Sequence, residues 1–230
     1  MWNPRTLGSI LESESIEKAD VVAWCNGARL AIDLAIRQPF RISSLVLVSP
    51  TFKGLTGTAL APSRFEQEIQ MLFDTAIKRP EVAPFCSKAI SQQAEPPDWD
   101  GLAHRGSERT RTLIELAARE HACGILAPLT DPASFVNMAC RVASDDNHPT
   151  RQALGQLRVR TMVIMGSHDH IVSNALASWA IQQCRNSVVA TTLMGAGHYI
   201  HDFAVSLFSI AVELVCRRPF WERLDFRAAT

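Results

Sequence analysis

Residues 20–31, DVVAWCNGARLA, constrain the fold most strongly, because a short β-branched run ends at Cys25 and a helix-forming run begins two residues later. Ala23 and Gly27 lie two positions before and two positions after this cysteine. A strand that turns sharply into a helix brings two backbone segments together, so larger side chains at these two positions would collide. The segment therefore predicts a strained strand–turn–helix unit with the Cys25 side chain at its apex.

A thiol at this apex lies beside a helix N-terminus. The helix dipole favours the thiolate there, and the thiolate is the nucleophilic form of cysteine. Cys25 is therefore a candidate nucleophile. The segment alone leaves a second interpretation open, in which Cys25 is a buried structural cysteine in an ordinary strand–turn–helix.

The chain alternates between strand and helix patterns on both sides of a long helical stretch. Strands are expected at 21–24, 44–48, 160–165 and 188–194, and helices at 3–18, 27–37, 173–184 and 203–216. The continuous apolar run at 44–48 is typical of a parallel strand that is buried on both faces. The alternation predicts an α/β protein with a doubly wound, mostly parallel sheet.

Residues 51–150 show no strand pattern. Helical periodicity appears there at 64–78, 107–121 and 132–143. We expect this stretch to form a helical cap inserted into an α/β core made of 1–50 and 151–230. Such a cap either lines a substrate pocket or is an additional bundle without catalytic consequence.

Charge and cysteine usage limit the partners and the compartment. The 230 residues carry 23 basic and 23 acidic side chains and no long basic block, so a nucleic-acid partner is not expected. The six cysteines show no CxxC pair. Residues 1–20 lack the apolar region of a secretion signal, and the apolar run 203–216 is too short to span a membrane. We expect a cytoplasmic protein with free thiols, no cofactor and no membrane partner.

Three chemically active residues follow three predicted strands. Cys25, Asp169 and His198 each lie just past the carboxyl end of a strand, which is the edge where open α/β sheets bind ligands. Two alternatives remain: Asp169 could be a surface acid whose place Asp145 or Asp146 takes, and His198 could be a packed loop histidine.

The motifs AWCNG, GSHD and GAGH, in this order, resemble the catalytic motifs of the α/β-hydrolase family over about residues 15–216. The chain departs from the family pattern at two positions, because Cys25 replaces the usual serine and Ala23 replaces the first glycine. The resemblance implies an α/β-hydrolase-like fold with a nucleophile elbow at Cys25.

The same resemblance assigns a role to each candidate residue. Cys25 would attack an acyl carbonyl, His198 would exchange the proton, and Asp169 would orient the imidazole. The backbone N–H of Asn26 would stabilise the oxyanion. A cysteine nucleophile forms an acyl thioester, which suits hydrolysis or transfer from a small or carrier-bound ester or thioester. The motifs do not choose among these reactions.

A metal centre is the weaker interpretation of the same region. The residues that could form it are His168, His170, His198, His201, Asp169 and Asp202. A binuclear hydrolase would require a tighter run of ligands than this one. We expect no metal.

Only 24 residues precede Cys25, whereas the family places about half its sheet and a second oxyanion donor before the elbow. We therefore expect a truncated fold in which the strand at 21–24 is an exposed edge. Loss of one oxyanion donor would cost about 3 kcal/mol in the transition state. The sequence is compatible with a fragment, with completion by a second copy or another chain, or with a non-catalytic relative that binds a partner through this edge.

Overall fold

The computed structural model describes residues 4–54, 57–94, 129, 131–146, 154–184 and 188–200, together with 206, 209, 212 and 213. The chain divides into two compact units. Residues 1–61 and 149–230 form the first, here called the sheet unit, and residues 62–148 form the second, here called the helical unit.

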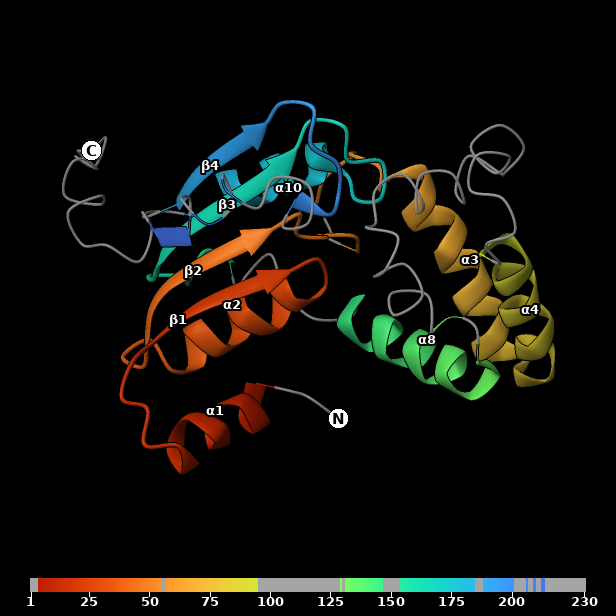
Figure 1. The fold of residues 1–230 in the computed structure, drawn as a ribbon, viewed down its shortest axis with the longest axis horizontal. Helices are drawn as coiled ribbons and strands as arrows, with labels where there is room; N and C mark the ends of the chain where they lie inside the picture. The colour runs from red at the N-terminus through yellow and green to blue at the C-terminus, as the bar shows by residue number, and fades with distance from the viewer. Residues whose placement is uncertain are drawn as a thin grey trace. The chain divides into compact units, whose positions relative to one another are not determined.

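The described part of the sheet unit contains four parallel strands in the order β1-β2-β3-β4 (Figure 1). Their bounds are β1 Ala19–Trp24, β2 Ile42–Val48, β3 Arg160–Gly166 and β4 Val188–Leu193. Each overlaps a strand that the sequence predicts, so the expectation of an α/β, mostly parallel sheet is confirmed. The ladder begins two residues earlier than predicted in β1 and β2, where Ala19 pairs with Ile42.

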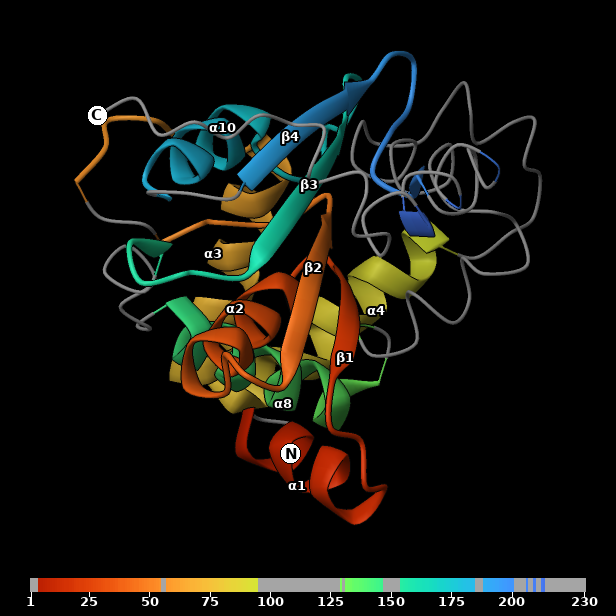
Figure 2. The same ribbon diagram turned by 90° about the vertical axis from the view of Figure 1, so that its left-hand side faces the viewer.

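Side chains of the two central strands alternate between two apolar clusters. Leu45, Leu47, Val163 and Met165 pack with residues of α2 (Gly27–Arg37) and α10 (Asn174–Gln182), which lie on the same face of the sheet (Figure 2). Val46, Val48, Met162 and Ile164 face the other way and pack with Ala196 and Ile200. Burial on both faces explains why these strands read as continuous apolar runs. The predicted helix at 203–216 lies almost entirely outside the described residues.

Helix α1 (Pro4–Ser13) is shorter than the helix predicted over 3–18. Ser15 adopts a left-handed φ of 54°. The N–H of Ile16 donates to the carbonyl of Leu11, and the N–H of Ser15 donates to the carbonyl of Glu12. These two bonds form a Schellman motif, which satisfies the last carbonyls and ends the helix. The prediction was wrong here because a serine occupies the position where glycine is the usual stop signal.

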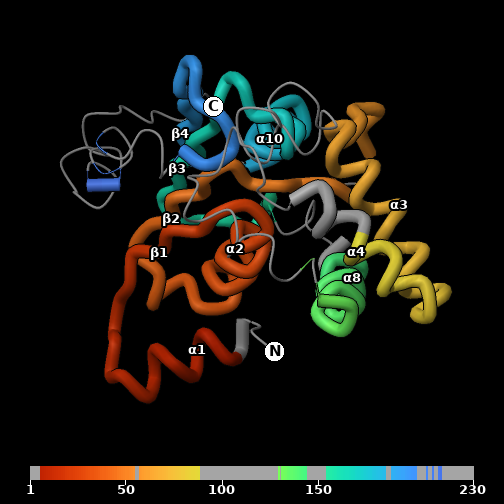
Figure 3. The backbone as a smooth tube through the Cα atoms, turned by 45° about the vertical axis from the view of Figure 1, so that its right-hand side comes forward, coloured from red at the N-terminus to blue at the C-terminus, as the bar shows by residue number. Residues whose placement is uncertain are grey.

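The described helices of the helical unit are α3 (Arg64–Lys78), the short η1 (Pro80–Val82), α4 (Ala83–Ala94) and α8 (Pro132–Asp146). Figure 3 shows α3, α4 and α8 lying side by side. Phe73 and Phe135 meet edge to face at the centre of their shared core, with ring centroids 5.2 Å apart.

The sequence predicts α3 and α8 but not α4. Pro84 in the first turn of α4 is compatible with a helix start, although the periodicity that follows it is weak. The predicted helix at 107–121 lies outside the described residues. No helix within the described ranges is long and apolar enough to cross a membrane.

Candidate active site

Cys25 occupies the sharp turn between β1 and α2. Its φ of 52° lies in the left-handed region, which is sparsely populated by residues with a side chain. Its N–H donates to the carbonyl of Val48 at 3.0 Å, and its carbonyl accepts from Ala28 at 3.2 Å. The strained turn predicted from the sequence is therefore present, and the half-buried thiol lies at the carboxyl edge of the sheet.

The small residues on either side of Cys25 meet as expected, with one correction. A Cβ built at Gly27 would lie 3.8 Å from the Cβ of Ala23, which is an ordinary van der Waals contact. The prediction that any larger side chain would collide is therefore wrong for alanine at position 27.

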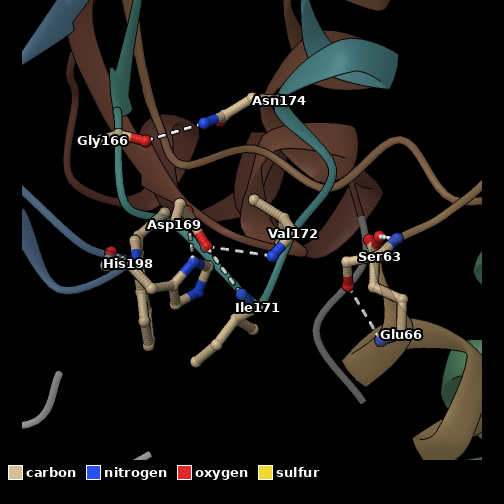
Figure 4. A network of polar contacts seen from close by, with 9 residues as sticks. Ser63, Glu66, Gly166, Asp169, Ile171, Val172, Asn174 and His198 are labelled. Carbon is tan, nitrogen blue, oxygen red and sulfur yellow. Dashed lines mark hydrogen bonds and ion pairs between the residues drawn. The ribbon is translucent and has the colours of Figure 1, made fainter. Parts of the chain in front are cut away.

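Asp169 and His198 come together from the loops that follow β3 and β4 (Figure 4). The Nδ1 of His198 lies 2.9 Å from Oδ2 of Asp169. The other carboxylate oxygen accepts the backbone N–H groups of Ile171 at 2.9 Å and Val172 at 3.0 Å. Both carboxylate oxygens of Asp169 are therefore engaged, and this fixes the orientation of the carboxylate toward the imidazole.

The two loops are held together by their backbones. The N–H of His168 donates to the carbonyl of Ala196 at 2.9 Å. A Cβ at Gly166 would lie only 2.3 Å from the carbonyl oxygen of Gly197, so glycine is required at the point of closest approach. This packing sets the distance between Asp169 and His198.

The imidazole of His198 is buried, yet it retains its proton well into the alkaline range. Burial lowers its pKa, but the negative charge of Cys25 and the hydrogen bonds to Asp169 and Cys25 outweigh burial and raise the pKa to about 10. Because Nδ1 faces Asp169, Nε2 is the ring nitrogen that remains for Cys25. The raised pKa keeps the His198 imidazole protonated beside Cys25 at neutral pH.

The other residues predicted from the sequence, Asn26, Asp145 and Asp146, lie in different parts of the fold. Asn26 has helical backbone angles immediately before α2, and its side chain makes no capping bond. Asp145 and Asp146 belong to α8 in the helical unit, whereas Asp169 bonds directly to His198. Asp169 is therefore the acid that accompanies His198.

The weaker metal interpretation involves residues beyond this pair. His168 and His170 are exposed on either side of Asp169, while His201 and Asp202 lie outside the described residues. Within the described ranges, no group of three His, Cys, Asp or Glu side chains is arranged to hold a metal ion.

Two aromatic residues beside His198 were missed from the sequence. The ring centroid of Trp24 lies 5.1 Å from that of His198, and Tyr199 meets the imidazole edge to face at 5.3 Å. Each is the immediate chain neighbour of a predicted site residue, since Trp24 precedes Cys25 and Tyr199 follows His198. That adjacency is the signal that could have identified them.

No protein-family model and no curated protein matches the sequence. Solved structures match the fold. Bromoperoxidase from Bacillus anthracis superimposes with a TM-score of 0.64 at 14% identity, over 92% of this chain and 72% of its own. A hydrolase from Oleispira antarctica superimposes with a TM-score of 0.64 at 13% identity, over 92% of this chain and 70% of its own. The meta-cleavage product hydrolase from Pseudomonas fluorescens IP01 superimposes with a TM-score of 0.58 at 16% identity, over 98% of this chain and 74% of its own.

The chain has the α/β-hydrolase fold. It spans about seven tenths of the length of these structures, which agrees with the expectation of a truncated member of the fold. The likeness concerns the fold, and the chemistry has to be argued from the residues of this chain.

Proposed function

We propose that this chain is a hydrolase or acyltransferase that acts on an ester or thioester through an acyl-Cys25 intermediate. The observation that carries the proposal is the 2.9 Å contact between His198 and Asp169, in a site where the charge of Cys25 also acts on the same imidazole. A nucleophile, a proton carrier and an orienting acid in mutual contact are the requirements for covalent acyl transfer.

In the first half-reaction, the thiolate of Cys25 attacks the acyl carbon and forms a C–S bond. The carbonyl electron pair moves onto oxygen, where the backbone N–H of Asn26 donates to the oxyanion. When the electron pair on the oxyanion re-forms the carbonyl double bond, the bond between the acyl carbon and the leaving thiol or alcohol breaks. The leaving group takes the proton of the His198 imidazolium, and the product is an S-acyl cysteine with a neutral imidazole.

In the second half-reaction, the neutral His198 removes a proton from water or from an acceptor amine, alcohol or thiol. The acceptor attacks the acyl carbon, the C–S bond breaks, and Cys25 leaves as the thiolate. The imidazolium is regenerated beside it, so the starting pair is restored. Asp169 stabilises the positive ring through the bond at Nδ1 and remains ionised throughout.

A thioester is the substrate that this pair suits best. Exchange of one thioester for another is nearly isoenergetic, so the acyl group remains activated for the second step. Structural neighbours include an N-acyl homoserine lactone degrading enzyme and a meta-cleavage product hydrolase. These names describe those proteins and do not identify a substrate for this chain.

The direct experiment is the intact mass of the protein after brief incubation with acyl thioesters of N-acetylcysteamine that differ in acyl length. Wild type is compared with Cys25→Ala, His198→Ala and Cys140→Ala, the last being a matched control because Cys140 is an exposed thiol in the helical unit. We expect one acyl adduct in wild type and in Cys140→Ala, and none in the other two variants. A folded wild-type protein that forms no adduct would contradict catalysis by this chain alone.

The exposed edge of the sheet favours a second candidate function. In the described part of the sheet β1 and β4 are the two terminal strands, and Val22 on β1 is 47% exposed. A free strand edge is a template for pairing with another strand. The alternative proposal is therefore a non-catalytic subunit that binds a second copy or another chain through β1. Stable association without acyl-adduct formation would favour it.

A further inference from the structure

The indole of Trp24 connects the chain segments that carry the nucleophile and the imidazole. Trp24 is the last residue of β1 and directly precedes Cys25. Its Nε1–H donates to the backbone carbonyl of His198 at 3.2 Å, across 174 residues of chain. The bond joins the end of β1 to the loop after β4, so displacement of the His198 backbone away from Trp24 would break it.

The same indole lies beside the imidazole ring. The Trp24 and His198 ring centroids are 5.1 Å apart and the planes are inclined by 50°. The third ring of the cluster, Tyr199, lies 5.2 Å from Trp24. A cation within about 6 Å of a tryptophan ring is attracted by the ring quadrupole, whereas a neutral imidazole is attracted less. We expect this contact to favour the protonated state of His198.

We propose that Trp24 is a positioning residue for His198. Its N–H fixes the backbone of His198, and its ring favours the imidazolium over the neutral ring. Among the described residues, the titratable groups that face the imidazole include Cys25 after β1, Asp169 after β3 and Tyr199 in its own loop. The inference rests on the proposed function, because it concerns how His198 is held for Cys25.

The two contributions of the indole can be separated by substitution. Trp24→Phe keeps an aromatic ring and removes the N–H donor, whereas Trp24→Leu removes both. Trp179→Phe on α10 is the matched control for the loss of an indole. Circular dichroism verifies that each variant is folded. The readouts are the pH titration of the His198 ring by NMR, the pH profile of Cys25 alkylation by iodoacetamide, and turnover of p-nitrophenyl acetate.

We expect Trp24→Leu to lower the titration midpoint of His198 by about half a pH unit, with a matching fall in Cys25 alkylation at neutral pH. Trp24→Phe should retain the midpoint but lower kcat by about 2- to 10-fold with little change in KM, because the backbone of His198 is no longer held. Trp179→Phe should match wild type in all three measurements. If Trp24→Leu does not fold, the kcat and KM of Trp24→Phe carry the test.

A folded Trp24→Leu variant with the His198 midpoint and alkylation profile of wild type would overturn the inference, as would a Trp24→Phe variant with unchanged kcat. These outcomes differ from failure of the proposed function. If wild type forms no acyl adduct while Trp24→Leu still lowers the His198 midpoint, then the function fails and the positioning role holds. If the adduct forms and no Trp24 variant differs, then the positioning role alone fails.

Discussion

The protonation of His198 is decided by opposing effects at a single side chain. Burial favours the neutral ring, but the charges of Cys25 and Asp169 and their hydrogen bonds prevail, so the pKa rises to about 10. The upward direction of this pKa shift has a direct consequence for catalysis. The proton needed by a leaving group is present throughout the neutral range and is lost as the pH rises through about 10.

Replacement of Cys25 by alanine should lower the pKa of His198. The variant removes the negative charge that contributes most to the raised value, while Asp169 remains in contact. We expect the midpoint to fall from about 10 by about 1 to 3 pH units, measured by NMR titration with His198→Gln used to assign the signal. An unchanged midpoint would show that Cys25 carries no charge beside the ring.

Replacement of Asp169 by asparagine should abolish most turnover with little effect on folding. Asparagine is nearly isosteric, but it presents no charge to the imidazolium and favours the wrong tautomer. We expect kcat/KM to fall by a factor on the order of 10² to 10⁴. Asp131→Asn is the control, because Asp131 accepts the N–H of Ser134 at 2.7 Å in the helical unit. Equal kinetics in the two variants would remove Asp169 from the mechanism.

At the scale of elements, the site depends on how closely the loops after β3 and β4 approach each other. The contact is made by backbone at Gly166, where a Cβ would lie 2.3 Å from the carbonyl oxygen of Gly197 and 2.4 Å from that of Ala196. Neither carbonyl is the end of a flexible side chain, so a substitution must displace a loop. The loop that would move carries His198.

Gly166→Ala should therefore reduce both stability and turnover. We expect a loss of about 1–3 kcal/mol in the free energy of unfolding, measured by urea denaturation, together with weaker alkylation of Cys25. Gly27→Ala is the matched control, because its Cβ would make an ordinary 3.8 Å contact with Ala23 at the first position of α2. If Gly166→Ala were as stable as Gly27→Ala, then the loops would not be held by this contact.

The elements show where prediction from sequence succeeds. Apolar runs and helical periodicity locate the strands and α2, α3, α8 and α10, because burial on one or both faces leaves a pattern in the local sequence. The local sequence pattern does not predict the end of α1, because Ser15 adopts a left-handed conformation although it is not a glycine. It also fails at Trp24, whose bond to His198 joins residues 174 positions apart and has no local signature.

At the scale of the whole molecule, β1 is a terminal strand of the described sheet, and this position bears on association with other chains. The described part of β1 pairs with β2 along one edge, and Val22 on it is 47% exposed. Strands in this position carry backbone donors and acceptors that another strand can use. Val22→Lys would add a charge beside that edge without entering the buried core.

Val22→Lys should lower association through β1 while leaving the His198–Asp169 contact intact. We expect a shift toward the monomer across a concentration series, measured by light scattering after size-exclusion chromatography. Phe40→Lys is the matched control, because Phe40 is 87% exposed and lies in the turn between α2 and β2 rather than on β1. Equal association of the two variants and wild type would argue against β1 as the interface.

The separate cores of the two units affect how this chain can vary. The core around Phe73 and Phe135 is built from residues of the helical unit, and the clusters on the two faces of the sheet are built from residues of the sheet unit. The described core residues of the helical unit and the Ser63–Glu66 capping box of α3 all lie within 62–148. Directed evolution of this chain could therefore diversify one unit and leave untouched the strand ends that hold Cys25, Asp169 and His198.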